Sequence, residues 1–213
     1  MPPLSDSRRG WFSNKLKGDF AENICNTHLS TLDYDVEKVG IENIAPKYAM
    51  NMSSFQTNFV VSQLNKTPDF VVSKRNDTAI FVEVKYNSTI DNSDQAFYDY
   101  GTALMIRYKE LIFRNEFHNS ITENITSQEL KNLILNNNNI FNDSNVYFYV
   151  LVPHRNYYNS YVFLFIPKKI DQRQWGWRGA ANTSIDDFSG IPDFHLRYDE
   201  LIKPFLDTIF NSN

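Results

Sequence analysis

The segment Thr67–Asn87 reads TPDFVVSKRNDTAIFVEVKYN and carries the strongest structural signal in the chain. Two apolar runs, Phe70–Ser73 and Ala79–Tyr86, flank a short polar segment. That segment contains Asn76 and Asp77, residue types that tolerate tight turns. Two apolar runs joined by such a turn predict a β-hairpin.

A hairpin centred on Asn76 places Asp69 opposite Glu83. Side chains alternate along a strand, so Glu83 and Lys85 share a face, and directly opposed residues share that face as well. We therefore expect Asp69, Glu83 and Lys85 to converge. The other face of the second strand is expected to enter the core, and it carries Ile80, Val82, Val84 and Tyr86.

Two interpretations of this charged face are open. It is either a solvated hairpin face with a Glu–Lys surface pair or a functional site. Val71 and Phe81 fall on the same face as the charges, which argues against a simply solvated surface. The run AIFVEVKY is almost continuously apolar, which is typical of a strand covered on both sides.

The hairpin residues resemble the signature of the PD-(D/E)XK nuclease superfamily. Pro68-Asp69 is followed, after thirteen residues, by Glu83-Val84-Lys85. The superfamily includes restriction endonucleases, Holliday-junction resolvases and phage-type exonucleases. The resemblance implies an α/β fold with a restriction-endonuclease-like mixed central β-sheet flanked by helices. It also implies metal-dependent hydrolysis of phosphodiester bonds, in DNA rather than RNA.

The resemblance also implies roles for individual residues. Asp69 and Glu83 would bind Mg²⁺, for which Mn²⁺ is expected to substitute, and the backbone carbonyl of Val84 would supply a third oxygen. Mg²⁺ needs only one or two carboxylates because it retains several waters. Lys85 would orient the attacking water or stabilise the charge of the transition state.

A helix is predicted from Ser13 to Leu32, and Glu22 falls at the edge of its apolar stripe. Lys15, Lys17-Gly18 and Glu22 resemble the first helix of the resolvase-like nucleases, in which a glutamate often supplies a further acid to the metal site. Glu22 is therefore a candidate catalytic and metal-binding residue. An ordinary exposed helix acid is the alternative.

A second helix is predicted from about Asn92 to Phe117. In many PD-(D/E)XK enzymes a glutamine on this helix lines the active site, which makes Gln95 a candidate catalytic residue. A capping box formed by Asn92 and Gln95 explains this glutamine equally well.

Elsewhere, apolar runs predict further strands and a closing helix. The strands are expected at Tyr34–Gly40, Phe59–Leu64, Val146–Val152 and Tyr161–Ile166, and the helix at Tyr198–Phe210 with a kink or break at Pro204. Residues 118–145 are polar and rich in asparagine, which indicates a surface insertion with a short helix at Ser127–Leu135.

The segment Gln172–Gly179 (QRQWGWRG) holds two tryptophans and two arginines. In a glycine-containing loop, Trp175 and Trp177 could stack on bases. They could also cap a hydrophobic edge or contact a partner protein. We favour a structural or partner-binding role.

The bulk composition fits one domain of residues 13–213 preceded by a loose tail of residues 1–12. The net charge is −4, so a nucleic-acid partner would need a local basic surface. Cys25 is the single cysteine, which excludes an intrachain disulfide and a multi-cysteine zinc site, and it is expected in the core. We expect a cytoplasmic protein with no membrane segment, and many relatives in the superfamily act as dimers, so a homodimer or a partner protein stays open.

Two alternatives to a nuclease remain. One is a non-catalytic nucleic-acid-binding or assembly module that keeps the nuclease fold. The other is a metal-binding structural domain without a nucleic-acid partner. The complete set of Asp69, Glu83 and Lys85 argues against the binding or assembly module, because such a module does not require all three residues, and the structural metal-binding domain stays open.

Overall fold

The structure is a computed structural model, and it describes residues 6–39, 68–74, 79–91, 93–104, 146–154, 159–166, 176–181, 191 and 193–211. The strands are β1 (Asp35–Lys38), β2 (Phe70–Ser73), β3 (Ile80–Tyr86), β4 (Val146–Leu151), β5 (Val162–Ile166) and β6 (Gly176–Gly179). They form one sheet in the order β1-β2-β3-β4-β5-β6. The β3–β4 pair is parallel and the other pairs are antiparallel, so the expected mixed sheet is confirmed.

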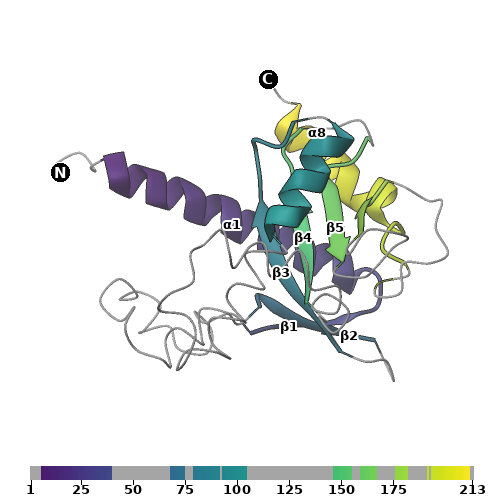
Figure 1. Cartoon of the computed structure of the whole chain (residues 1–213). Coiled ribbons are helices and arrows are strands. Elements are labelled where there is room, and N and C mark those ends of the chain that lie inside the picture. Colours follow the sequence, from purple (N-terminus) through teal and green to yellow (C-terminus); the bar gives the residue numbers. More distant parts are fainter. Residues whose placement is uncertain are drawn as a thin grey trace, which may run out of the picture.

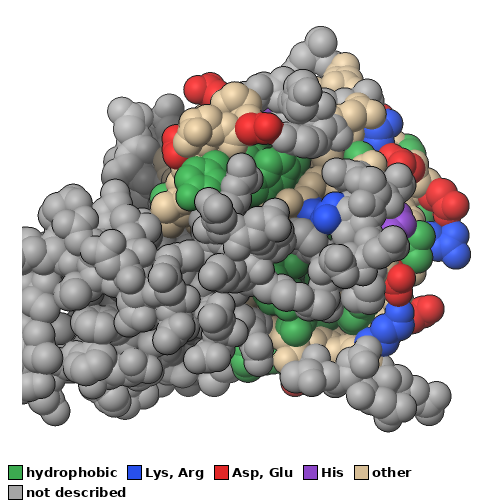
Figure 2. All heavy atoms as spheres, turned by 45° about the vertical axis from the view of Figure 1, so that its right-hand side comes forward, with side chains coloured by type: hydrophobic (Ala, Val, Ile, Leu, Met, Phe, Trp, Pro, Cys, Tyr) green, Lys and Arg blue, Asp and Glu red, His purple; other side chains and the backbone are tan. Residues whose placement is uncertain are grey.

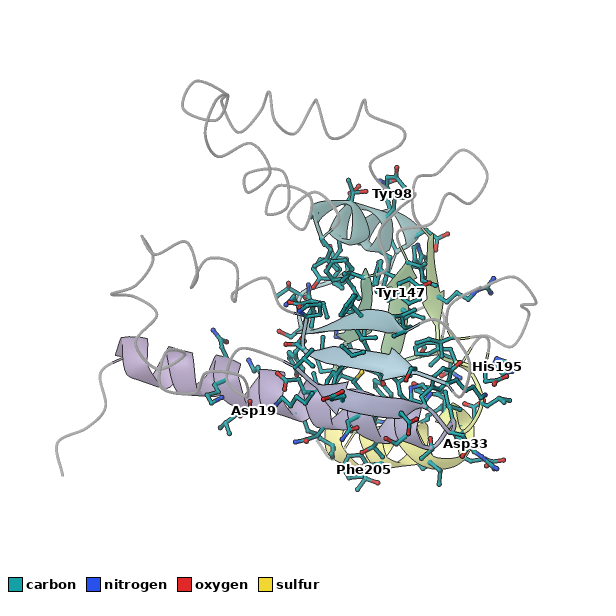
Figure 3. All side chains as sticks on the ribbon, turned by 90° about the horizontal axis from the view of Figure 1, so that it is seen from below. Asp19, Asp33, Tyr98, Tyr147, His195 and Phe205 are labelled. Carbon is teal, nitrogen blue, oxygen red and sulfur yellow. The ribbon has the colours of Figure 1, made fainter. Side chains whose placement is uncertain are left out.

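Helices cover both faces of the sheet (Figures 1 and 3). One face packs against α1 (Asp6–Ser30) and the C-terminal helices, through a cluster that includes Cys25, Val84 and Leu206. The other face packs against a helix over residues 94–104, through a cluster that includes Phe97 and Phe148. Because both faces are covered, the chain forms a three-layer α/β domain.

β4 and β5 are interior strands of the sheet, and every residue in them is buried. The apolar runs that predicted these strands therefore describe central strands, as expected when both faces of a sheet are covered. In the helix over residues 94–104, Phe97 and Leu104 are buried against this layer, which confirms part of the predicted apolar face.

The predicted hairpin register is confirmed, because Val71 pairs with Phe81 and Phe70 pairs with Val82. Ile80, Val82 and Val84 are buried on the face that packs against α1. Phe81, however, is 38% exposed, so the expectation that β3 is covered on both faces along its whole length is wrong. The face of β3 that carries Phe81, Glu83 and Lys85 is therefore exposed at Phe81 and half-buried at the other two residues.

The N-terminal boundary differs from the prediction. α1 begins at Asp6, so residues 6–12 of the expected tail are helical, and it ends at Ser30, two residues before the predicted end at Leu32. The prediction relied on apolar periodicity, which is present only where a helix packs against a core. The first part of α1 extends beyond the sheet and needs no apolar stripe (Figure 1).

Gly176–Gly179 is an edge strand, β6, and not part of a loop as predicted. The Trp177 ring packs on Phe97 with ring centroids 5.2 Å apart, and it also contacts Phe163 and Phe165. This packing supports the structural role that we favoured for Trp177. Trp175 lies outside the described residues.

The C-terminal segment consists of a five-residue π-helix, η1 (Tyr198–Ile202), followed directly by α8 (Lys203–Phe210). Pro204 stands in the first turn of α8, so the predicted break is confirmed. Two hydrogen bonds tie this segment to the start of β5: the Tyr161 N–H donates to the Tyr198 hydroxyl, and the Tyr161 hydroxyl donates to Asp207 Oδ1, each over 2.8 Å.

The remaining predicted elements, Phe59–Leu64, residues 118–145 with Ser127–Leu135, and the later part of the helix to Phe117, lie outside the described residues. In the described ranges, no helix has the length and apolar character needed to cross a membrane. Acidic and basic side chains are interspersed along one edge of the surface in Figure 2. Ion pairs such as Lys74–Asp193 and Arg197–Glu200 illustrate this balance.

We expect the Trp177→Ala substitution to lower the free energy of unfolding by about 3 kcal/mol, because it removes an aromatic side chain that covers the face of β5. Urea denaturation followed by far-UV circular dichroism measures this change. The Trp177→Phe variant is the control and should lose less. Unchanged stability together with weaker binding of nucleic acid would instead support base stacking.

Candidate active site beside the end of β2

The candidate site lies where β2 ends beside β3. The printed pairs of this hairpin extend only to Phe70↔Val82, so the second half of β3 continues past β2. Asp69 immediately precedes β2, and its Oδ2 accepts a hydrogen bond from the Val84 N–H over 2.6 Å. The Asp69 carbonyl accepts from the Val39 N–H over 2.9 Å. Asp69 is therefore held at both its backbone and its side chain.

Glu83 and Lys85 lie on the face of β3 that is opposite α1. Their partners in the parallel pair with β4 are Phe148 and Val150, which belong to the cluster under the 94–104 helix. The Lys85 ammonium donates a hydrogen bond to Glu83 Oε1. Asp69 lies close enough to both side chains for their charges to affect its pKa, so the predicted convergence of the three residues is confirmed.

The pKa of Asp69 rises from its usual value of 3.8 to about 7. Burial is the largest cause, because it removes the carboxylate from water, and the nearby charge of Glu83 is the second. The hydrogen bond from Val84 and the charge of Lys85 act in the opposite direction. The carboxylates of Asp69 and Glu83 thus repel each other, and a cation bound between them would reduce this repulsion.

Lys85 is a cation in this arrangement. Burial lowers the pKa of its ammonium, but the charge and the hydrogen bond of Glu83, together with the charge of Asp69, outweigh that effect and leave the pKa above its usual value. A protonated lysine donates hydrogen bonds and stabilises negative charge, and it does not accept a proton. The geometry therefore favours charge stabilisation over general-base catalysis for Lys85.

A cavity of about 360 Å³ opens beside Asp69, between β3 and the first half of α1. It is lined by Asn14, Lys17, Gly18, Glu22, Asp69, Val84, Lys85, Tyr86 and Ser88. Three of the predicted site side chains, Glu22, Asp69 and Lys85, therefore border one cavity. Glu83 lies next to this cavity through its hydrogen bond with Lys85.

Glu22 reaches the site from α1 but already has a cationic partner. Its Oε2 lies 2.6 Å from Nζ of Lys38 on β1, and its charge contributes to the raised pKa of Asp69. The interpretation as an ordinary exposed helix acid is wrong, since the Glu22 side chain is only 16% exposed. The structure therefore places Glu22 at the site, and its ion pair also joins α1 to the edge of the sheet.

The structure does not bring Gln95 to this site. Gln95 is exposed, and its side-chain amide donates a hydrogen bond to Asp99 one turn later. The Ser93 hydroxyl accepts from the Ala96 N–H and caps the helix, and Asn92, the other member of the predicted capping box, lies outside the described residues. From the same helix it is Tyr100 whose charge affects the pKa of Lys85.

Within the described ranges, no three His, Cys, Asp or Glu side chains are close enough to hold a metal ion together. The predicted set of Asp69, Glu83 and Glu22 therefore does not form a closed three-carboxylate cage. Asp69 and Glu83 alone still fit Mg²⁺, because this ion accepts one or two carboxylates and fills its other positions with water. Lys85 pairs with Glu83 and the pKa of Asp69 is still raised, so a bound cation would stabilise the ionised form of Asp69.

Asn14, Tyr86 and Ser88 line the cavity and Lys38 contacts Glu22, although none of these four was predicted at the site. Asn14, Gly18 and Glu22 lie four residues apart along α1, so they share one face of the helix, and this spacing was a readable signal. Lys38 and Tyr86 had no such signal, because the contact of Lys38 with Glu22 and the approach of Tyr86 to α1 depend on how the elements pack. Cys25 is buried as expected, and burial raises the pKa of its thiol.

Comparison with known proteins does not identify a family for this chain. It matches no family model, no curated protein and no solved structure. Its function is therefore argued from the residues of the site and their geometry.

We expect the contribution of Asp69 to folding stability in EDTA to fall as pH rises from about 4 to about 7, because the folded protein holds the proton of Asp69 more tightly than the unfolded chain does. The Asp69→Asn variant lacks this proton and keeps an acceptor for the Val84 N–H. Its stability relative to the wild type should therefore rise by on the order of 2–3 kcal/mol between pH 5 and pH 8. Urea unfolding at both pH values measures the change, and a pH-independent difference would contradict it.

Proposed function

We propose that the protein is a metal-dependent nuclease that hydrolyses phosphodiester bonds in DNA. One observation carries this proposal: the buried Asp69 carboxyl, with its pKa raised to about 7, lies beside Glu83 and Lys85 at the border of an open cavity. Structural ion-pair networks also perturb pKa values, but a carboxyl pair with a lysine at the border of an open cavity suits a site that binds a cation and an anionic substrate.

The residues divide the work of hydrolysis between them. Asp69 and Glu83 would hold Mg²⁺, which when bound supplies positive charge to the phosphodiester and lowers the pKa of a bound water. Lys85 donates hydrogen bonds to the phosphoryl oxygens as negative charge develops on them. The water oxygen forms a new bond to phosphorus, the bond to one sugar oxygen breaks, and that oxygen takes up a proton.

A restriction-endonuclease-like fold is part of this proposal. The mixed sheet with helices on both faces supports it, as does the position of Asp69 before one strand and of Glu83 and Lys85 on the next. We also carry forward Mn²⁺ as a substitute for Mg²⁺, since it accepts the same oxygen ligands.

The alternative, a non-catalytic assembly module of this fold, is favoured by a different observation. Leu201, Phe205 and Ile209 are about half exposed and recur every fourth residue along η1 and α8. An exposed apolar row of this kind is typical of protein interfaces. It is compatible with a homodimer or a partner protein whether or not the site is catalytic.

The test is cleavage of supercoiled plasmid, linear duplex, single strand, four-way junction and structured RNA in Mg²⁺, Mn²⁺ or EDTA. We expect metal-dependent cleavage of DNA that falls by at least about 100-fold in Asp69→Ala and in Lys85→Ala, because the first removes a metal ligand and the second removes a positive charge that stabilises the reacting phosphate. The Lys74→Ala variant, which changes a lysine paired with Asp193 away from the site, is the matched control.

Full activity in Lys85→Ala would contradict the proposed mechanism. Absence of cleavage in the folded wild type on every substrate would favour the assembly module. Cleavage that survives EDTA would exclude the proposed use of a metal.

We expect Glu22→Gln to lower cleavage more than Lys38→Gln does, because Glu22 borders the cavity, whereas Lys38 does not line it and reaches the site through its ion pair with Glu22. Rates at saturating Mg²⁺, compared with thermal unfolding of both variants, separate the two effects. Equal losses in activity and in stability would make Glu22 a purely structural residue.

A further inference from the structure

Helix α1 has two environments along its length. Its second half packs in the core through Ala21, Cys25 and Leu29, each of which is fully buried. Its first half extends past the strands (Figures 1 and 3), and residues 13–17 are exposed. The cavity beside Asp69 begins where the core contact ends, so the extended half of α1 forms one of its walls.

The two kinds of lining residue differ in chemistry. Glu22, Asp69 and the neighbouring Glu83 are the acidic groups of the site. Asn14, Lys17 and Ser88 carry hydrogen-bond donors and no negative charge. A cavity lined by both carboxylates and hydrogen-bond donors matches a phosphodiester chain whose scissile group lies at the carboxylates and whose next phosphate lies at Asn14 and Lys17.

Lys17 is placed to meet such a phosphate. Its ammonium lies 5.8 Å from the centre of the Tyr86 ring, a cation–π distance that holds it at the cavity. Among the residues that the structure describes, no carboxylate lies within ion-pair distance of Lys17. Lys15, in contrast, is on the other side of α1 and pairs with Asp19 over 3.3 Å.

The separation along the helix fits a nearby phosphate. Lys17 and Glu22 are five residues apart, which corresponds to about 7.5 Å along the axis of α1. Duplex DNA rises about 3.4 Å per base pair, so this length covers roughly two nucleotide steps. Positions 8 and 9, near the start of the same helix, are arginines in a chain whose net charge is −4.

Gly18 has no structural reason to lack a side chain. It lies inside α1, where glycine is less favourable than alanine, and a Cβ built at this position would meet no atom within 4 Å. Gly18 lines the cavity, so a side chain at this position would enter it. Its missing side chain leaves room for a backbone to approach the helix.

We propose that the wall formed by Asn14, Lys17 and Gly18 is a subsite for the DNA phosphate one or two nucleotides from the bond to be cut. Lys17 contacts that phosphate, and Gly18 is the point where the sugar-phosphate backbone comes closest to α1. The subsite rests on the proposed function for its location next to the scissile bond. It makes α1 the element that aligns the DNA strand.

The test is the binding of a fluorescein-labelled 20-base-pair DNA duplex in EDTA, followed by anisotropy at several salt concentrations. Relative to the wild type, Lys17→Gln should weaken binding several-fold and lower the slope of log K against log salt by about 0.9, because one phosphate contact is lost. Lys15→Gln removes the same charge from the opposite side of α1 and should leave the slope unchanged. With Mg²⁺, Lys17→Gln should raise KM and leave kcat near the wild-type value.

The outcomes distinguish this inference from the proposed function. Equal slopes in the Lys17 and Lys15 variants would overturn the subsite even if Mg²⁺-dependent cleavage is found. A lower slope in Lys17→Gln alone would support the subsite even if no cleavage occurs, in which case the nuclease proposal fails. No binding of the duplex by the wild type would overturn the subsite.

Gly18 provides an independent measurement. Gly18→Ala should raise Tm by about 2–4 °C, since alanine favours the helix and meets no steric obstacle. Gly18→Leu should also remain folded but weaken binding of the duplex at least about 10-fold, because its side chain fills the cavity. Wild-type affinity in a folded Gly18→Leu protein would overturn the assigned role of Gly18.

Discussion

The site depends on the hydrogen bond from the Val84 N–H to the Asp69 carboxylate. β3 is longer than the strand beside it, so Val84 would otherwise expose an unpaired N–H at the end of the hairpin. Asp69 satisfies that group with its side chain while its own carbonyl stays bonded to Val39. One mismatch in strand length thus brings a carboxyl group into a buried position beside Glu83.

Burial of Asp69 is the main cause of its raised pKa. A carboxylate in this position is costly, and the cost increases because Glu83 and Glu22 are near. Each of these two neighbours is partly neutralised by a lysine, Glu83 by Lys85 and Glu22 by Lys38. Asp69 has only hydrogen bonding and the more distant charge of Lys85 to offset its burial. Among the described residues, Asp69 has the least compensation from nearby positive charge of the three carboxyl groups, so its ionised form is the one that a bound cation would stabilise most.

Local patterns in the sequence predicted the parts of the fold that depend on neighbouring residues. The hairpin expected from the sequence has the observed register, with Val71 opposite Phe81, and two apolar runs located β4 and β5. The parts that the sequence did not predict depend on contacts between distant residues or on the direction of a side chain around a helix. Gln95 turns away from the site and bonds to Asp99, because side-chain direction changes by about 100° per helical residue and is fixed only when the helix packs. Trp177 lies in an edge strand because aromatic residues of another helix and of β5 receive its ring.

The continuous helix α1 has a consequence for local stability. Amide groups in its core half, around Ala21 and Cys25, can exchange hydrogen only when much of the domain opens, whereas those near Asn14 can exchange by fraying from the N-terminal end. One unbroken helix therefore contains two cooperative regions that meet near Gly18. A ligand bound along the exposed region would slow the hydrogen exchange of amides nearer the N-terminus. More of the helix would then exchange only when the whole domain opens.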